Sequence, residues 1–341
     1  MDRPHDAHGR PLRSLRLSVT DRCNLRCSYC MPEEIYTWLP KKEILSFEES
    51  VSLVRELVPL GVTKIRLTGG EPLLRRDLPD LVSRLAGIEA LEEIALTTNA
   101  VRLGDLAPRL KEAGLDRITI SLDTLRQDRF LEMTRRDELG RALAGIRAAG
   151  DAGFVGTKLN TVVMRGKNDD ELADLLRFGA EEGIEIRFIE YMDVGGATQW
   201  SMDTVVSASE MLQRLQSELG DIEPLETERT AAPADRFQLG NGQTFGIIAS
   251  TTRPFCSQCD RARLTADGRF FTCLYAEDGE EITGTLREEG PIAAAEQIRR
   301  IWTARDDRGA EVRHAAKDRA ALADSATLRD KPHLEMHTRG G

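Results

Sequence analysis

The six cysteines of the chain fall into two groups of three, and their spacing is the clearest chemical signal in the sequence. The first group has the pattern C-x3-C-x2-C near the start, and the second has C-x2-C-x13-C near the end. The six are Cys23, Cys27 and Cys30, then Cys256, Cys259 and Cys273. Three thiols so close in sequence are more typical of ligands to one soft metal centre than of disulfides, which are rare in a reducing compartment. The sequence therefore predicts two metal centres.

Each group lacks the fourth ligand of an ordinary metal site. Three thiolates hold three corners of a [4Fe–4S] cluster and leave the fourth iron open to another molecule. The alternatives for a bare trio are a zinc site with a distant fourth ligand, or three structural cysteines. Histidine does not complete either group, because all five histidines lie near the ends of the chain and none has the spacing for it.

A second motif, RLTGGEPLLRRDL at residues 66–78, follows a predicted strand. Gly69 and Gly70 let the backbone come close to a ligand, and Glu71 with Pro72 fixes the turn. A glycine pair after a strand is an ordinary turn in most proteins, so the motif gains meaning only beside the first cysteine trio.

The second trio encloses two arginines, Arg261 and Arg263. A zinc knuckle is the alternative for a lone C-x2-C. Two guanidiniums beside an iron centre favour an anionic or electron-rich ligand and raise the potential of the cluster, whereas a structural zinc needs neither.

Six short apolar runs rich in β-branched residues alternate with amphipathic helical stretches. The predicted strands span residues 15–20, 64–69, 93–98, 117–122, 157–164 and 185–192. Helical spacing is clear in residues 47–61, 78–87 and 169–183. This alternation predicts a parallel sheet, either open or curled into a barrel. The first trio follows the first strand, where a loop over the mouth of such a structure belongs.

The pattern changes after residue 222, so we expect two domains, residues 1–222 and 223–341. A polar connection with two prolines (223–236) precedes short antiparallel strands within 237–271, among which TADGRF predicts a hairpin. A helix near 291–304 and a charged tail that ends in Arg339, Gly340 and Gly341 complete the chain.

Composition is that of a soluble globular protein, with 40% hydrophobic and 30% charged residues. The formal charge of −10 argues against a general nucleic-acid binder. No apolar run approaches the length of a membrane span, and the first twenty residues alternate charges where a signal peptide would be apolar. We therefore expect a cytoplasmic protein.

The first trio, with Tyr29 before its last cysteine and the glycine pair downstream, resembles the signature of radical S-adenosylmethionine (SAM) enzymes. With both trios, the run CDRARL and the terminal Gly-Gly, the chain from about Arg13 onward resembles the GTP 3′,8-cyclase family of molybdenum cofactor biosynthesis. The resemblance implies an incomplete (β/α)6 barrel with a smaller C-terminal α+β domain. That domain would carry a second cluster facing the first across a cavity.

The resemblance also implies a reaction. SAM binds the open iron of the first cluster, and one electron splits it to a 5′-deoxyadenosyl radical. This radical removes the 3′ hydrogen of GTP, the carbon radical attacks C8 of guanine, and reduction gives 3′,8-cyclo-7,8-dihydro-GTP. The expected cofactors are two [4Fe–4S] clusters and SAM, and the expected partners are GTP, an electron donor and the cyclic pyranopterin monophosphate synthase that receives the product. A homodimer is compatible with this interpretation, and neither nucleic acid nor membrane is expected as a partner.

Site residues follow from the same resemblance. The SAM contacts are Tyr29, Gly70, Asn99, Ser121 and Met192. The GTP contacts are Arg16, Lys64, Arg66, Thr97, Lys158, Arg187, Arg261, Ala262 and Arg263. The second cluster would bind the guanine edge, Arg261 and Arg263 would serve radical quenching or base placement, and the tail (Arg339, Gly340 and Gly341) would reach into the active site.

Taken alone, each of these basic residues is an ordinary surface cation, although positions 64 and 66 share one face of a strand. Two rival functions stay open at this point. One is another radical SAM enzyme with an auxiliary cluster that acts on a peptide, and the other is a non-catalytic zinc-binding protein.

Overall fold

The computed structural model describes residues 3–33, 35–226 and 231–340, and its centre is a single twelve-stranded sheet. The strand order is β12-β11-β10-β1-β2-β3-β4-β5-β6-β9-β8-β7. The first six strands are β1 (Ser14–Ser18), β2 (Lys64–Thr68), β3 (Glu93–Thr98), β4 (Arg117–Ser121), β5 (Lys158–Val163) and β6 (Glu185–Glu190). They run parallel to one another, as the strand-and-helix alternation predicts.

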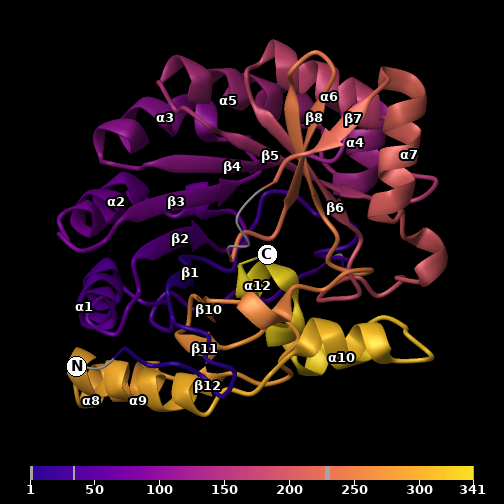
Figure 1. Ribbon diagram of the computed structural model, residues 1–341. Coiled ribbons are helices and arrows are strands. Elements are labelled where there is room, and N and C mark those ends of the chain that lie inside the picture. Colours follow the sequence, from indigo (N-terminus) through magenta and orange to yellow (C-terminus); the bar gives the residue numbers. More distant parts are fainter. Residues whose placement is uncertain (1–2, 34, 227–230, 341) are drawn as a thin grey trace.

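Helices cover one side of these strands (Figure 1). They are α1 (Phe47–Leu57), α2 (Leu78–Ala86), α3 (Leu103–Glu112), α4 (Gln127–Thr134), α5 (Leu139–Asp151) and α6 (Leu172–Glu181). Ser46 caps the start of α1, where a capping box with Glu49 satisfies the first amide groups. Alternate strand residues such as Leu15 and Leu17 enter the core beneath the helices, so the residues between them line the other side of the sheet.

The remaining strands belong to the C-terminal region. They are β7 (Ile222–Pro224), β8 (Asp235–Leu239), β9 (Thr244–Ile248), β10 (Arg261–Leu264), β11 (Arg269–Phe271) and β12 (Glu280–Glu281). The expected hairpin is confirmed: β10 and β11 are antiparallel, and Gly268 adopts φ 77° in the turn.

The expectation of purely antiparallel pairing in this region is wrong for two strands. β9 pairs in parallel with β6, and β10 pairs in parallel with β1. Without them the outer edges of β1 and β6 would leave unpaired backbone groups. The parallel part of the sheet therefore has eight strands, but β9 and β10 are not neighbours, so the barrel of six strand-helix units stays incomplete as expected.

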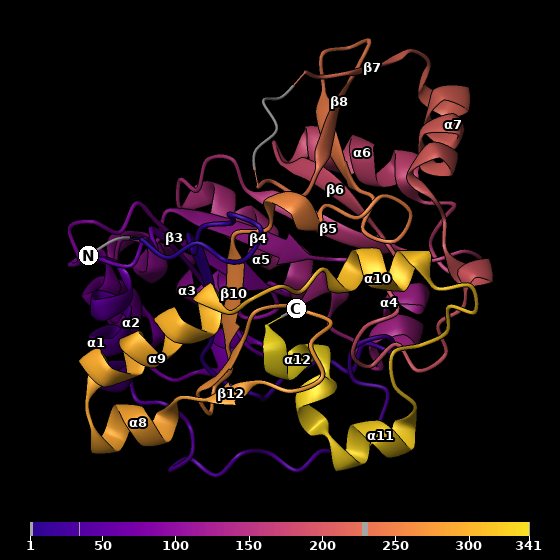
Figure 2. The ribbon, with the colours of Figure 1, turned by 60° about the horizontal axis from the view of Figure 1, so that its bottom comes forward.

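The other α-helices are α7 (Ala208–Leu219), α8 (Thr283–Glu288), α9 (Pro291–Thr303), α10 (Gly309–Ala315), α11 (Ser325–Asp330) and α12 (Met336–Arg339). Short 3-10 turns are η1 (Pro72–Leu74), η2 (Met202–Thr204), η3 (Cys256–Gln258) and η4 (Pro332–Leu334). The helix predicted near 291–304 is α9, which packs against α1 and is seen with α8 in Figure 2. Among the residues that the structure describes, no helix has the length and apolar character needed to cross a membrane.

Candidate active site

The first cysteine trio lies in the long loop between β1 and α1. The carbonyl oxygen of Cys27 accepts hydrogen bonds from the amides of Cys30 (3.0 Å) and Met31 (2.8 Å), which closes a tight turn. Arg26 donates to the carbonyl of Cys23 at 2.8 Å and lies over the ring of Trp38. The loop is therefore held in shape by its own backbone and by one guanidinium.

The thiols of this trio are not in disulfides, and they are near enough to act electrostatically on one another. Burial raises the pKa of Cys27 and Cys30 well above the usual value of a cysteine. For Cys30, the next largest cause is the neighbouring Cys23. Burial raises the pKa of Cys23 to about 11. Thiolates so placed need a cation, and binding a cluster would supply it. In the described ranges no three His, Cys, Asp or Glu side chains converge on one metal ion, which is compatible with a cluster whose thiolates bind different irons.

The glycine pair after β2 runs directly against the cysteine loop. The amide of Gly70 donates to the carbonyl of Thr20 at 2.9 Å, and the amide of Glu71 donates to that of Arg22 at 2.8 Å. A Cβ atom on Gly70 would lie 2.4 Å from the Arg22 oxygen, and Gly69 has φ 149°. Only glycine permits this approach.

Buried polar groups fix the ends of the neighbouring strands. Glu71 accepts from the Thr98 hydroxyl (2.7 Å) and the Asn99 amide (2.8 Å), and burial raises its pKa to about 7. The Asn99 side chain in turn donates to Asn24 of the cysteine loop at 2.9 Å. The loop after β3 is thereby tied to the first trio.

Tyr29, which the resemblance assigns to SAM, is held by a residue that the sequence did not single out. Its hydroxyl donates a hydrogen bond to Asp123 at 2.7 Å. Burial raises the pKa of Tyr29, and the negative charge of Asp123 raises it further. Asp123 also accepts from the Val162 amide at 2.9 Å, and burial raises its pKa to about 6. Asp123 lies just after β4, so only the fold brings it to the cysteine loop.

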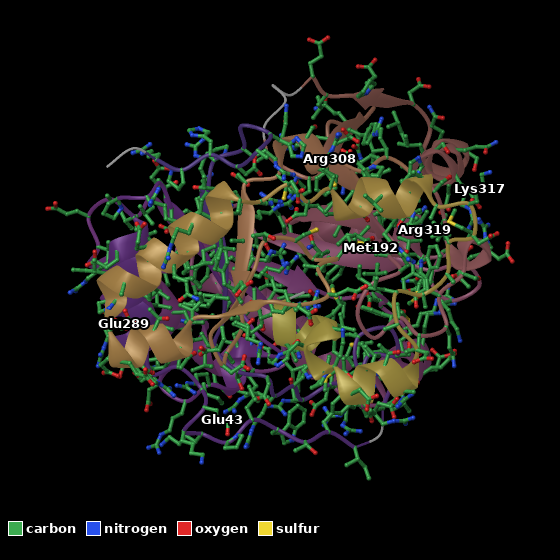
Figure 3. The ribbon with its side chains drawn as sticks, turned by 90° about the horizontal axis from the view of Figure 1, so that it is seen from below. Glu43, Met192, Glu289, Arg308, Lys317 and Arg319 are labelled. Carbon is green, nitrogen blue, oxygen red and sulfur yellow. The ribbon has the colours of Figure 1, made fainter. Side chains whose placement is uncertain are left out.

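The five residues expected to contact SAM all gather at one end of the sheet. Tyr29 follows β1, while the other four lie at or just after the carboxyl ends of β2, β3, β4 and β6: Gly70, Asn99, Ser121 and Met192. Figure 3 labels Met192, whose neighbour Asp193 binds the Arg319 guanidinium at 2.7 Å. This end is where loops build active sites in β/α barrels.

The side of the sheet away from the helices is strongly basic, and we call it the basic face. Its cations come from neighbouring strands in matching register: Arg16 lies opposite both Arg66 and Arg263. The full set is Arg16, Lys64, Arg66, Arg117, Lys158, Arg187, Arg261 and Arg263. Seven of these eight were predicted as GTP contacts, and Arg117 was not, because no motif surrounds it.

Thr97 also lies on the basic face, where its hydroxyl accepts from Arg66 at 3.3 Å. Ala262 does not join the set, because its side chain is buried in the apolar core on the other side of the sheet. Lys64 is exposed at the first residue of β2.

The charges on the basic face oppose one another. Burial is the main cause that lowers the pKa of Arg16, and the positive charges of Arg263 and Arg66 lower it further. Burial also lowers the pKa of Arg66 to about 10, with Arg117 as the next largest cause. Burial, followed by Arg187, lowers the pKa of Lys158 to about 8.

Two carboxylates on the basic face offset part of the charge. Glu185 pairs with Arg187 at 2.9 Å and with Arg236 of β8 at 2.8 Å, and Glu93 pairs with Arg117. An excess of cations remains, which suits a highly charged anion such as a triphosphate.

The second trio lies beside the basic face at the start of β10. The Cys259 amide donates to the Cys256 carbonyl at 3.2 Å, and the Tyr275 amide donates to the Cys273 sulfur at 3.4 Å. Burial opposes ionisation of Cys259, but Arg261 and Arg305 outweigh it and lower the pKa of that thiol. Burial raises the pKa of Cys256 and, followed by Asp307, that of Cys273, and both thiols interact electrostatically with Cys259. Three thiols placed in this way fit a second iron–sulfur cluster.

The tail contacts the basic face through Gly340, whereas the side chain of Arg339 does not. The carbonyl of Gly340 accepts from Arg16 (2.9 Å) and Arg263 (2.7 Å), and the C-terminal end lies against the open side of the sheet (Figure 1). The Arg339 guanidinium points elsewhere: it donates to the carbonyl of Leu274 at 2.8 Å and lies over the ring of Phe271. Gly341 lies outside the described residues.

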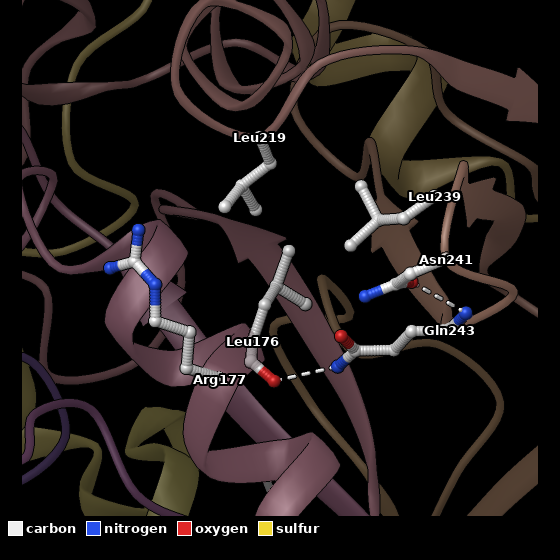
Figure 4. Close-up of a pocket in the computed structure, with 6 residues that line it drawn as sticks. All are labelled: Leu176, Arg177, Leu219, Leu239, Asn241 and Gln243. Atoms are coloured by element: carbon white, nitrogen blue, oxygen red, sulfur yellow. Dashed lines mark hydrogen bonds between the residues drawn. The ribbon is translucent and has the colours of Figure 1, made fainter.

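A separate hollow of about 120 Å³ lies between α6, the end of α7 and the β8–β9 turn (Figure 4). Its lining residues are Leu176, Arg177, Leu219, Leu239, Asn241 and Gln243. The Gln243 side chain spans it and donates to the Leu176 carbonyl at 2.6 Å. None of these residues carries the predicted chemistry, so the hollow is not part of the candidate site.

A partial β/α barrel with a three-cysteine loop after its first strand and a glycine pair after its second defines a radical SAM enzyme. The model of the radical SAM superfamily matches residues 17–179, and that of Molybdenum Cofactor Synthesis C matches residues 184–311. By sequence, the chain belongs to the GTP 3′,8-cyclase family. Such an enzyme uses a [4Fe–4S] cluster and SAM.

The relatives that show this family cover nearly all of the chain. GTP 3′,8-cyclase 1 of Mycobacterium tuberculosis is 50% identical over 99% of this chain and 96% of its own length. GTP 3′,8-cyclase of Aquifex aeolicus is 43% identical over 92% of this chain and 95% of its own length. Among solved structures, Streptococcus suis SuiB bound to S-adenosylmethionine has a TM-score of 0.61 at 15% identity, over 90% of this chain and 69% of that one, which supports the fold alone.

Proposed function

We propose that this protein cyclises GTP to (8S)-3′,8-cyclo-7,8-dihydroguanosine 5′-triphosphate, the first step of molybdenum cofactor biosynthesis. One observation carries the proposal beyond membership of the family: a row of half-buried guanidiniums, Arg263, Arg16 and Arg66, crosses three adjacent strands of the sheet. A triphosphate is the ligand class that such a row would neutralise.

At the first trio, Cys23, Cys27 and Cys30 would hold a [4Fe–4S] cluster with one open iron. When bound, this cluster supplies the electron that cleaves SAM to methionine and the 5′-deoxyadenosyl radical. The chain would hold SAM through Tyr29, Gly70, Asn99, Ser121 and Met192. The bond from Tyr29 to Asp123 fixes the tyrosine ring beside the last cysteine of the trio.

On the basic face, the triphosphate of GTP would lie along Arg16, Lys64, Arg66, Lys158 and Arg187, with Thr97 near the ribose. This position keeps the ribose at the carboxyl ends of the strands, where SAM is expected. The 3′ hydrogen then leaves in 5′-deoxyadenosine, a bond forms between C3′ and C8, and one electron and one proton complete the product. The two electrons used per turnover require an external one-electron donor.

The second trio would hold a second [4Fe–4S] cluster whose open iron meets the guanine edge. Arg261 and Arg263 flank that position, with Ala262 contributing through its main chain. For the tail, the bonds of Gly340 to Arg16 and Arg263 support a role at the substrate for Gly340 and Gly341. Arg339 would keep α12 in place through the carbonyls of Leu274, Ala276 and Glu277 and would not bring its own charge to the substrate.

Further proposals concern the surroundings of the enzyme. The product would pass to the cyclic pyranopterin monophosphate synthase. A cytoplasmic location and a homodimer both stay predictions, and no nucleic-acid or membrane partner is proposed.

The decisive test is incubation of the reduced, iron-loaded protein with SAM and GTP. We expect about eight irons per chain, and equal amounts of 5′-deoxyadenosine and the cyclised nucleotide. ATP in place of GTP serves as the control and should give no cyclised product. Zinc without iron would identify a metal-binding protein of another class, and 5′-deoxyadenosine without a cyclised nucleotide would identify a radical SAM enzyme with a different substrate, such as a peptide.

A further inference from the structure

The segment before β1 has no role in the chemistry described so far, yet it contacts the second trio. Residues 3–13 form a small loop closed by a bridge between His5 and Pro11. Two of its charged side chains are almost fully buried: Arg10 is 3% exposed and Asp6 is 6% exposed. Burial of charge is unusual, and it is costly unless the charges are paired and hydrogen-bonded.

Arg10 uses its whole guanidinium fork within this region. One Nη atom donates to the carbonyl of Cys256 at 2.9 Å, the other donates to that of Asp307 at 2.8 Å, and Nε donates to Asp6. Its own carbonyl accepts from the Trp302 indole at 3.0 Å. Arg10 thus joins the N-terminal segment, helix α9 and the first cysteine of the C-x2-C turn.

Arg305 makes the matching contact at the other end of the turn. Its guanidinium donates to the carbonyl of Cys259 at 2.9 Å, lies 4.5 Å from the centre of the Trp302 ring, and is 3.6 Å from Asp6. Its carbonyl accepts from the Ala7 amide at 3.0 Å. Asp6 therefore lies between two buried arginines, and each arginine binds the backbone of one cysteine.

This arrangement differs from a general packing contact. The planar guanidinium of an arginine fixes the direction of a hydrogen bond as well as its distance. Arg10 donates to the carbonyl of Cys256, and Arg305 donates to that of Cys259. Residues that hydrogen-bond to metal ligands without touching the metal orient those ligands, and substituting them typically lowers metal affinity by about ten- to a hundredfold.

We propose that Asp6, Arg10 and Arg305 form an N-terminal clamp that fixes the Cys256–Cys259 turn in the shape its metal cluster requires. The clamp residues are positioning residues, since they touch the cysteine backbone and not the substrate. The inference rests on the proposed second cluster. It makes the segment before the barrel a part of the C-terminal metal centre, joined to it across the whole length of the sequence.

The test compares Arg10→Met with Arg3→Gln, which removes the same charge from an exposed position in the same segment. In cluster-free protein, we expect the amides of residues 256–260 to exchange hydrogen at least about tenfold faster in Arg10→Met. After iron loading, this variant should hold about four irons per chain where the wild type holds about eight. It should still cleave SAM while losing the cyclised product, whereas Arg3→Gln should match the wild type in every measurement.

A second variant, Arg10→Lys, keeps the charge and removes the fork. Exchange at residues 256–260 should still rise, by a smaller factor, because one ammonium cannot serve Asp6, Cys256 and Asp307 together. Wild-type exchange and iron content in both variants would overturn the clamp. If the wild type itself holds only about four irons, the second cluster is wrong, and faster exchange confined to 256–260 would still support the clamp.

Discussion

At the scale of single residues, the basic face holds more positive charge than its own carboxylates neutralise. The effect of this excess charge is clearest at Lys158. Burial, and then the positive charges of Arg187 and Arg117, lower the pKa of Lys158 to about 8. An ordinary lysine keeps its proton to about pH 10.4. The binding of a phosphate would stabilise the protonated form, so the charge of Lys158 is coupled to the substrate near neutral pH.

The first prediction concerns pH. GTP affinity should fall about tenfold between pH 7 and pH 9, because free Lys158 loses its proton over this range and binding must restore it. Calorimetric titration of cluster-free protein measures this directly. In Lys158→Met the affinity should be lower and the fall should disappear, whereas Lys41→Met, at an exposed position, should keep it. Equal affinity at both pH values in the wild type would contradict the assignment of Lys158 to the triphosphate.

Residues that act as neighbours in sequence were predictable, and residues that meet across the fold were not. The two cysteine trios and the glycine pair can be recognised from their spacing in the sequence. Arg117 and Asp123 are single polar residues in strand-and-loop sequence of ordinary character, and their roles depend on which strands pair with which. Arg10 shows the limit most clearly, because its partner Cys256 is 246 residues away.

At the scale of elements, the loop after β2 acts as the support for the cysteine loop. Its backbone makes two hydrogen bonds to residues 20 and 22, and no side chain separates the two segments. The shape of the first trio therefore depends on the absence of a Cβ atom at Gly70.

Gly70→Ala tests this dependence. The new methyl group would meet the carbonyl carbon and oxygen of Arg22 at 2.6 and 2.4 Å, and backbone atoms cannot rotate away. We expect a loss of about 1–3 kcal/mol in the free energy of unfolding, and at least about tenfold slower SAM cleavage. Thermal unfolding and 5′-deoxyadenosine yield measure the two effects.

Gly140→Ala is the matched control, because it lies in α5 with no atom within 4 Å of the added Cβ. Because alanine restricts the unfolded chain, this variant should gain about 0.4–1 kcal/mol in the free energy of unfolding, with SAM cleavage unchanged. If Gly70→Ala behaved like Gly140→Ala, the close approach of the two loops would not be required.

The strands illustrate what sequence periodicity determines. The six predicted strands agree with β1–β6 to within one or two residues at each end, because alternation and β-branched residues identify a buried strand. The partners of β9 and β10 were missed, since the side-chain pattern of a short strand says nothing about whether its neighbour is parallel. The barrel itself came from resemblance and not from periodicity.

At the scale of the whole molecule, the two ends of the chain meet around the active site. The segment before β1 contacts the second trio through Arg10, and near the other end the Gly340 carbonyl accepts hydrogen bonds from Arg16 and Arg263, which lie on two paired strands. A Cβ atom at Gly340, where φ is 67°, would lie 2.0 Å from the Thr68 hydroxyl, so only glycine fits this position.

Deleting Gly340 and Gly341 should therefore reduce formation of the cyclised nucleotide by at least about tenfold, while leaving the iron content and SAM cleavage unchanged. The ratio of cyclised nucleotide to 5′-deoxyadenosine measures the effect without dependence on protein loading. Full activity in this truncated protein would refute the role of the tail. A fall in iron content would assign the tail to assembly of the metal centres and not to turnover.

The pairing of β1 with β10 also has a consequence for how the protein is made. Ser14 lies opposite Arg261, so one edge of the first strand stays open while the ribosome produces the chain between them. At about 5–20 residues per second this interval lasts roughly ten seconds to a minute. Throughout it the nascent polypeptide presents an unpaired strand edge, the kind of surface that chaperones shield, and the sheet covers that edge only after β10 has been made.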